Sequence, residues 1–266
     1  MFNGLFHIRE PINEPVLVAV QGYGSGQWPP LVKGGIPRAK KVGGRMVDAH
    51  HLARAAVRST RPDAQVGVAV NSVAVIADED SRRARALHAF VDFMTNWWFL
   101  EKTEGDTDFI GLQYYGRVLP QQLLKGAGLA GPPGPEGVSD LGWPLFSEGL
   151  YRMVRETAKR YETPIYITEN GIADAADTRR EAFIVNHLAW LHRAMREGAD
   201  VRGYFHWALT DNFEWLEGFE PRFGLVGIDY ETLARSVRPS AKRYAEICRT
   251  GLVEVPADHP SLVWEL

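Results

Sequence analysis

Two short segments of the chain each place one carboxylate where an extended run meets a turn. Glu169 lies in Thr168-Glu169-Asn170-Gly171, directly after an apolar run at residues 164–167. The Asn-Gly that follows it predicts a sharp turn. Glu14 lies in Asn13-Glu14-Pro15 near the start of the chain, where proline ends a strand. Either glutamate alone also fits a helix cap or a surface ion pair, but a pair of carboxylates is what glycoside hydrolysis requires.

A third segment, residues 203–215, is rich in aromatic and acidic side chains. It contains Trp207, Glu214 and Trp215. An indole face stacks on the CH face of a pyranose, and a carboxylate accepts hydrogen bonds from sugar hydroxyls. This composition is typical of a sugar subsite, and it supports the same chemistry as the two glutamates.

Residues 113–117, Gln-Tyr-Tyr-Gly-Arg, follow another apolar run. A phenol there could donate a hydrogen bond to a carboxylate, and an arginine could hold that carboxylate ionised. The alternative is that a tyrosine packs in the core and Arg117 stays solvated. We expect Tyr114 to be the core residue and Tyr115 to be the functional one.

We expect the other aromatic and histidine residues to have structural roles and not catalytic ones. Trp97 and Trp98 lie within a helical pattern, so we expect core packing. The histidines lack metal-ligand spacing, and the pair His50-His51 predicts a solvated helix face. We therefore expect no metal site and no cofactor. The glycines of residues 22–26 lack the lysine and the preceding strand of a phosphate-binding loop.

Strand-like and helix-like segments alternate along the chain, which predicts an α/β fold with parallel strands. Thr178-Arg-Arg-Glu181 has the spacing of a capping box, and Pro239 suits a first helical turn. Residues 125–142 are rich in glycine and proline and predict a long loop near the active site. Expected strands are residues 5–8, 66–70, 109–112, 165–168 and 203–209; expected helices are residues 39–60, 80–100, 147–161, 178–198 and 239–250.

The bulk composition fits one globular domain over residues 1–266. The chain is 45% apolar and 24% charged, with a net charge of −3 from interspersed groups. This charge pattern argues against nucleic-acid and membrane partners. Cys248 is alone, which excludes an internal disulfide framework. With no secretion signal and no membrane-length apolar run, the expected location is the cytoplasm.

Several ordered motifs resemble glycoside hydrolase family 1, the β-glucosidase-like enzymes, over most of the chain. The resemblance implies a (β/α)8 TIM-barrel type of fold, incomplete in this chain, with residues 1–266 as the carboxyl-terminal part of the barrel, about strands 4 to 8. The motifs are Ile12-Asn-Glu-Pro15, Gly26-Gln-Trp-Pro-Pro30, Val66-Gly-Val-Ala-Val-Asn71, Asn96-Trp-Trp-Phe99, Asp108-Phe-Ile-Gly-Leu-Gln-Tyr-Tyr115, Tyr166-Ile-Thr-Glu-Asn-Gly171, Asp211-Asn-Phe-Glu-Trp215 and Arg222-Phe-Gly-Leu225.

The resemblance also implies a reaction and the residues that perform it. It implies a retaining β-glycosidase in which Glu169 is the nucleophile and Glu14 the acid/base, with the pKa of Glu14 raised by the nearby Glu169 carboxylate. Tyr115 would orient Glu169. The substrate would be a β-glycoside, either a small molecule or an oligosaccharide.

The same resemblance implies a binding site for the glycone, the sugar on the non-reducing side of the cleaved bond. Asn13 would touch the sugar 2-hydroxyl, and Trp207 would stack under the ring. Glu214 and Trp215 would contact the ring hydroxyls.

Two departures from the family leave alternatives open. Gln113 stands where the family usually has asparagine. The strand-helix units that precede the Asn-Glu-Pro strand in the family, with a sugar-binding Gln, a His and an Arg beside the nucleophile, have no counterpart in these 266 residues. The alternatives to an active glycosidase are a catalytically weak sugar-binding or assembly module, and a chain that self-associates or needs a complementing amino-terminal half.

Overall fold

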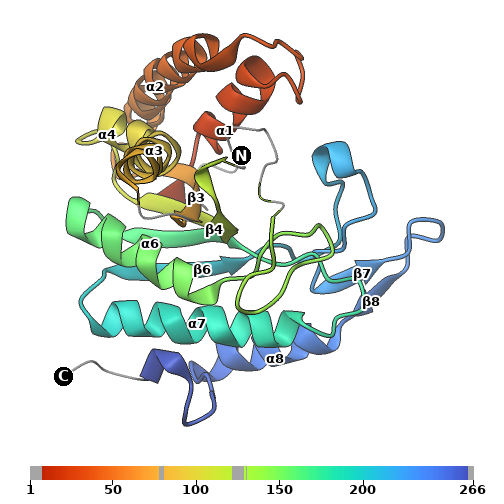
Figure 1. Ribbon diagram of the computed structural model, residues 1–266. Helices are drawn as coiled ribbons and strands as arrows, with labels where there is room; N and C mark the ends of the chain where they lie inside the picture. Colours follow the sequence, from red (N-terminus) through yellow and green to blue (C-terminus); the bar gives the residue numbers. More distant parts are fainter. Residues whose placement is uncertain (1–7, 78–80, 122–128, 130, 263–266) are drawn as a thin grey trace.

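Four parallel strands form the centre of the computed structural model, which describes residues 8–77, 81–121, 129 and 131–262. The order in the sheet is β3 (Val68–Val75), β4 (Ile110–Val118), β5 (Ile165–Asn170) and β6 (Val201–His206). Neighbours in the sheet are also neighbours in the sequence, and helices connect them, so the topology is that of successive β/α units (Figure 1). The α/β prediction is confirmed.

A fifth extended segment continues this order before β3. The short strand β1 (Ile8–Arg9) pairs in parallel with β2 (Gln65–Val66), and Asn13 forms a parallel bridge with Ala69 of β3. The backbone N–H of Glu14 donates to the carbonyl of Ala69 at 3.0 Å. Residues 8–14 therefore lie alongside β2 and the start of β3, and they place Glu14 at the same sheet edge as the ends of the following strands.

Helices cover the sheet, and the expected ones are present with modest shifts at their ends. In Figure 1, α2, α3 and α4 lie in the upper part of the molecule, and α6, α7 and α8 follow one another in the middle and lower part. The helical segments are α1 (Pro15–Ala19), η1 (Val20–Gly24), α2 (Gly35–Thr60), α3 (Arg82–Asp92), η2 (Phe93–Trp97), α4 (Trp98–Thr103), α6 (Ser147–Arg160), α7 (Arg180–Arg196), η3 (Trp215–Glu217), α8 (Pro239–Thr250) and η4 (Pro260–Leu262).

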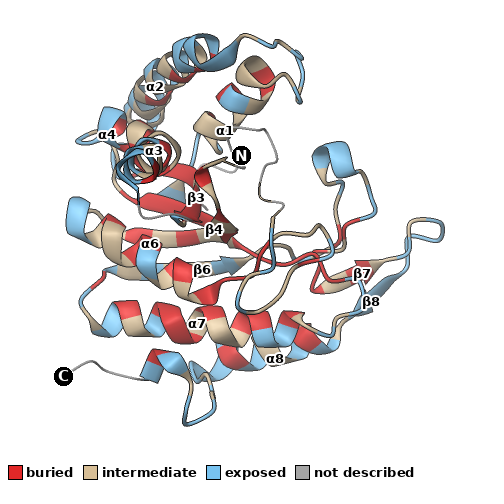
Figure 2. Ribbon diagram, in the orientation of Figure 1, coloured by how far each residue is buried: buried red, intermediate tan, exposed pale blue. Residues whose placement is uncertain are grey.

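The core forms where α6 and α7 pack on the sheet. Leu112, Leu150, Val154 and Ile167 are buried in one apolar cluster, and Figure 2 shows this buried layer running through the strands and the inner faces of the helices. Trp97 belongs to the same cluster and Trp98 packs against it, so their predicted core role is confirmed.

Two local predictions are wrong. His50 is fully buried and its Nε2 lies 2.9 Å from the carbonyl oxygen of Asp106, because α2 packs against the loop after α4 and does not leave this face to solvent. The capping box at residues 178–181 does not form. Instead the carboxylate of Asp174 accepts from the backbone N–H groups of Arg179 and Arg180 at 2.8 and 3.0 Å, which satisfies the start of α7 from outside.

The structure adds an unpredicted antiparallel hairpin, β7 (Val226–Ile228) with β8 (Arg235–Val237). Part of the predicted loop, residues 125–128 and 130, lies outside the described residues. Residues 131–142 contain turns and isolated bridges only, as expected for a loop. No helix in the described part of the chain is long and apolar enough to span a membrane.

Candidate active site

The sheet register brings Glu169 beside Gln113, the residue opposite it on β4. Gln113 is buried, and its Nε2 donates to Glu169 Oε1 at 2.6 Å and to Asn13 Oδ1 at 2.7 Å. Its amide therefore links the segment that carries Glu14 to the strand that carries Glu169. Asn13 and Glu169 are 100 and 56 positions away from Gln113 in the sequence. They meet at Gln113 because the parallel strands end at one edge of the sheet.

Tyr115 holds the other oxygen of Glu169. Its hydroxyl donates to Glu169 Oε2 at 2.6 Å. The ring is buried, with Trp143 and Phe223 at centroid distances of 5.6 and 6.3 Å. Burial and the nearby Glu169 raise the pKa of Tyr115 well above its usual value, so the phenol remains a donor at neutral pH.

Glu14 occupies a constrained backbone position immediately before α1. Its φ of 45° lies in the left-handed region, which is uncommon for a residue with a side chain. Pro15 at the first helical position fixes the start of the helix. The Glu14 side chain makes no cap hydrogen bond to α1, so it is available to the candidate active site.

The two carboxyls have different pKa values for identifiable reasons. Burial is the main cause that raises the pKa of Glu14 to about 8, and the negative charge of Glu169 is the second. Burial also raises the pKa of Glu169, to about 6, while the hydrogen bond from Tyr115 lowers it. At neutral pH, Glu14 is thus the protonated member of the pair and Glu169 the ionised one.

The aromatic and acidic segment after β6 lies close to the same edge. The backbone N–H of Trp207 donates to the carbonyl of Asn170 at 3.0 Å, which anchors the segment to the end of β5. The carboxylate of Glu214 accepts from Asn212 Nδ2 at 3.0 Å, and it also accepts from the side chain of Trp207. Trp207 and Glu214 are therefore joined to each other beside the Glu169 strand.

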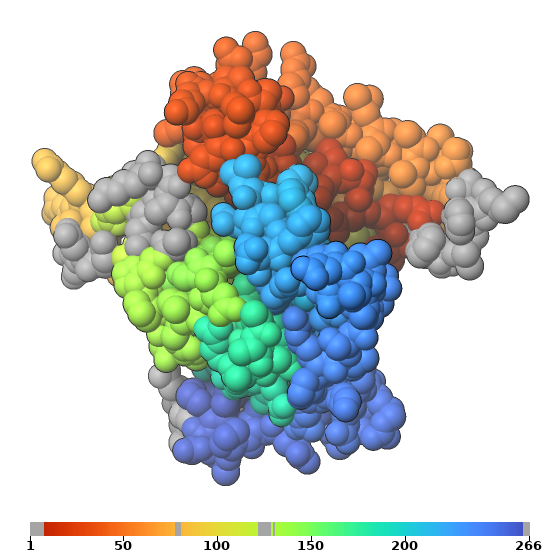
Figure 3. All heavy atoms as spheres, turned by 90° about the vertical axis from the view of Figure 1, so that its right-hand side faces the viewer, coloured from red at the N-terminus to blue at the C-terminus, as the bar shows by residue number. Residues whose placement is uncertain are grey.

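Trp215 is 65% exposed, and it stacks on Trp28 with ring centroids 5.3 Å apart. This contact joins the loop after η1 to the segment after β6. Figure 3 shows the pale blue atoms of the later segment reaching the red and orange atoms of the amino-terminal part. The two indoles thus form an aromatic stack between these two segments.

Tyr114 is a core residue, as predicted. It is fully buried and its hydroxyl donates to the carbonyl of Phe146 at 2.7 Å. Arg117 does not hold Glu169: its guanidinium donates to the carbonyl of Pro133 at 3.0 Å. The first tyrosine therefore supports the fold while the second, Tyr115, contacts the carboxylate.

Several residues near the site were not assigned a role from the sequence. Trp28 stacks on Trp215, and Gln113 bridges Asn13 to Glu169. Glu10 interacts electrostatically with Glu169. The available signal for Glu10 was its position four residues before Glu14 in the same extended segment.

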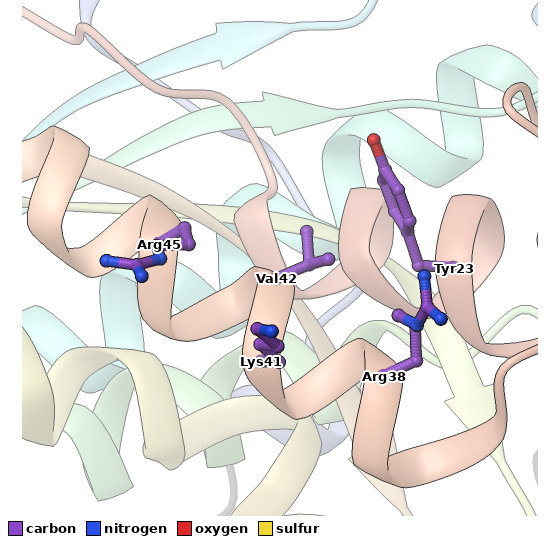
Figure 4. Close-up of a pocket in the computed structure, with 5 residues that line it drawn as sticks. All are labelled: Tyr23, Arg38, Lys41, Val42 and Arg45. Atoms are coloured by element: carbon purple, nitrogen blue, oxygen red, sulfur yellow. The ribbon is translucent and has the colours of Figure 1, made fainter.

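A shallow pocket of about 300 Å³ lies elsewhere, between η1 and the outer face of α2. Figure 4 shows Arg38, Lys41 and Arg45 along the helix with Tyr23 beside them. None of its lining residues is a carboxylate, so this pocket is separate from the Glu14 and Glu169 site. Across the described ranges, no group of three or more His, Cys, Asp or Glu side chains is arranged to hold a metal ion.

Comparisons with known proteins agree with the geometry. The sequence profile of Glycosyl hydrolase family 1 matches residues 7–124 and 134–252. A β-galactosidase of Saccharolobus solfataricus is 32% identical over 97% of this chain and 58% of its own length. β-Glucosidase A of Thermotoga maritima is 28% identical over 91% of this chain and 63% of its own length.

Solved structures show the same relationship. A β-glycosidase from Pyrococcus horikoshii superposes with a TM-score of 0.80 at 33% identity, over 91% of this chain and 61% of its own. A structure from Fervidobacterium pennivoraus, Fpglu1, gives a TM-score of 0.86 at 28% identity, over 99% and 61%. The chain thus spans about six-tenths of the length of these proteins, and its parallel strands and helices form an incomplete α/β barrel.

Proposed function

Because the chain belongs to glycosyl hydrolase family 1, we propose that its site hydrolyses β-glycosidic bonds with retention of configuration, through a covalent glycosyl-enzyme intermediate. The observation that supports this most is the arrangement around Glu169. Tyr115 and Gln113 each donate to one of its carboxylate oxygens, and Glu14 lies near enough for its pKa to rise in response to the Glu169 charge.

In the first step, Glu169 attacks the anomeric carbon as the glycosidic bond breaks. Its two hydrogen bonds fix the carboxylate in one orientation, which is how a positioned nucleophile gains rate. Glu14, protonated at neutral pH, gives its proton to the leaving oxygen. The products are a free alcohol and an ester between the sugar and Glu169.

In the second step, Glu14 acts as a base. It takes a proton from water while the water oxygen attacks the anomeric carbon, which releases Glu169 as a carboxylate and restores the proton on Glu14. The loss of the Glu169 charge in the ester lowers the pKa of Glu14, because that charge is one of the causes of its elevation. The same residue therefore suits both roles.

The proposed glycone subsite uses the other predicted residues. Asn13 is oriented by the bond that its Oδ1 accepts from Gln113, which directs its amide toward the sugar 2-hydroxyl. Trp207 stacks under the ring, and Glu214, already joined to Trp207, accepts from ring hydroxyls. The exposed Trp215 contacts the outer part of the sugar. We propose β-glucosides and β-galactosides as the first substrates to examine, since relatives are named for both.

A second candidate function is a sugar-binding or assembly module without turnover. It is favoured by the open edge of β6, which has a partner strand on one side only within the described residues. This alternative predicts saturable glycoside binding with no product.

A panel of nitrophenyl β-glycosides separates the two functions. The wild type should release nitrophenol from at least one of them, and Glu169→Gln should reduce the rate by at least about 10³-fold if Glu169 is the nucleophile. Glu231→Gln is the matched control, because Glu231 is an exposed turn residue and its loss should leave the rate unchanged. If the protein melts cooperatively and binds a glycoside in calorimetry but releases no nitrophenol, the sugar-binding or assembly module would be favoured.

A further inference from the structure

Residues 15–47 form a tract without acidic side chains. The whole chain contains 33 aspartates and glutamates, and none of them lies in this tract. The tract contains five cationic residues, which are Lys33, Arg38, Lys40, Lys41 and Arg45. The chain as a whole has a net charge of −3, so this tract is a local exception. A cluster of one sign of charge raises the local concentration of counter-ions, which here are anions.

The helix α2 places three of these cations on one face. Arg38, Lys41 and Arg45 are three and four positions apart, which is the spacing at which helical side chains are neighbours. Figure 4 shows them along the helix, with the ring of Tyr23 from η1 beside Arg38. The backbone N–H of Gly34 donates to the carbonyl of Tyr23 at 3.1 Å. This bond holds η1 against the start of α2, and it keeps the tyrosine next to the cationic face.

The three cations, Tyr23 and Val42 line a pocket of about 300 Å³. Tyr23 and Val42 are partly buried, and they supply an aromatic and an aliphatic surface beside the charged groups. The volume is at the lower end of the range for small-molecule sites. The pocket therefore suits a small anion, with room for an organic group attached to it.

The fold offsets little of this positive charge. Among the residues that the structure describes, Arg38 and Lys41 form no ion pair. Arg45 pairs with Asp48 at 3.2 Å, but the two side chains are 78% and 60% exposed, and exposed pairs of this kind stabilise little. The first turn of α2 contains no acidic residue, so the positive end of the helix dipole adds to the same region. Like charges one turn apart repel each other, and a bound anion relieves that repulsion.

We propose that this pocket binds a phosphate group, which Arg38 and Lys41 hold with support from Arg45. A phosphate dianion has several acceptor oxygens, so it accepts hydrogen bonds from more than one cation at once. An arginine guanidinium matches phosphate geometry with two parallel N–H donors, and a lysine ammonium adds a point charge. The phosphate is either the free ion or part of an ester whose organic group packs against Tyr23. The site does not depend on the proposed glycosidase reaction, because none of its residues takes part in that reaction.

Isothermal titration calorimetry at about pH 8, where phosphate groups are mostly dianions, tests the proposal without any turnover. Inorganic phosphate represents the free ion, phenyl phosphate represents an ester, and acetate is an oxyanion with a single charge. All titrations have the same ionic strength, because salt screens exposed charges. We expect phosphate or phenyl phosphate to bind at least about threefold more tightly than acetate, which corresponds to one additional exposed ion pair. Tighter binding of phenyl phosphate than of inorganic phosphate identifies an ester as the ligand, and equal or weaker binding identifies the free ion.

Variants locate the binding in this pocket. Arg38→Gln and Lys41→Gln should each weaken phosphate binding about threefold or more, and both residues are exposed, so the fold should be retained. Arg196→Gln is the control, because Arg196 is an exposed arginine in the last turn of α7 that does not line the pocket. The control should bind phosphate as the wild type does.

Three results would overturn the proposal. The first is that neither inorganic phosphate nor phenyl phosphate binds, and the second is that acetate binds as tightly as both. The third is that Arg38→Gln and Lys41→Gln leave binding unchanged, or weaken it no more than Arg196→Gln does. Failure of the glycosidase reaction would leave the binding result unchanged, since the titrations contain no glycoside.

Discussion

Tyr115→Phe tests the electrostatics of the site with a small structural change. The substitution removes only the hydroxyl that donates to Glu169 Oε2 at 2.6 Å. The ring remains in its contacts with Trp143 and Phe223, so no cavity forms. Any change in Glu169 therefore reports the lost hydrogen bond.

The expected size follows from the strength of that bond. A hydrogen bond to a charged group is worth roughly 1.5–3 kcal/mol, and about 1.36 kcal/mol corresponds to one pKa unit. The Tyr115 bond favours the ionised form and lowers the pKa of Glu169. Its loss should raise the pKa of Glu169 from about 6 to between about 7 and about 8.

Carbon-13 NMR of labelled glutamate carboxyls measures this pKa directly, and the Glu169 signal is assigned by its absence in Glu169→Gln. Tyr114→Phe is the matched control, since the Tyr114 hydroxyl donates to the carbonyl of Phe146. The control should leave the Glu169 titration unchanged. An unchanged or lower Glu169 pKa in Tyr115→Phe would show that the Tyr115 hydroxyl does not stabilise the ionised carboxylate. In pH–rate profiles, the acidic limb should move upward in the same variant.

Three further predictions concern catalysis and stability. Glu14→Gln should remove the basic limb near pH 8 and slow cleavage of methyl glycosides by about 10²- to 10⁴-fold; steady-state kinetics with an unchanged basic limb would contradict this. Leu150→Ala in the fully buried core should cost about 2–5 kcal/mol of unfolding free energy by urea titration, whereas exposed Leu52→Ala should cost less than about 0.5 kcal/mol. Asp211→Asn should cost about 3 kcal/mol, because Asp211 bonds Arg238 and two backbone N–H groups. These bonds lower the pKa of Asp211. The stabilisation of the fold by ionised Asp211 is therefore complete above the pKa of an unfolded aspartate and is lost as the pH falls through the lower pKa of the folded state. Thermal melts in which wild type and variant lose stability equally in acid would contradict this prediction.

The strands and the position of the two glutamates at strand ends could be predicted because their signals are local. The apolar run at residues 164–167 and the turn at Asn170-Gly171 lie next to Glu169 in the sequence, and parallel strands bring their ends to one edge. The same rule explains why Asn13, Glu14 and Glu169 meet. The expected distinction between Tyr114 and Tyr115 follows from alternation along a strand, and the hydrogen bonds of both residues agree with it.

The features that escaped prediction depend on partners distant in the sequence. The burial of His50 depends on Asp106, and the cap of α7 depends on Asp174 outside the expected box. The stack of Trp28 on Trp215 joins segments almost 190 residues apart. Periodicity and local spacing carry no information about such contacts, because tertiary packing decides them.

The most direct test of the proposed mechanism is covalent trapping of the nucleophile. A 2-deoxy-2-fluoro β-glycoside with a dinitrophenyl leaving group forms the intermediate quickly, and the electron-withdrawing fluorine slows its hydrolysis. We expect one added sugar on the peptide that contains Glu169, found by mass spectrometry of the digested wild type and absent from Glu169→Gln. A sugar on a different residue, or no adduct on a protein that releases nitrophenol, would contradict the assignment of Glu169 as the nucleophile.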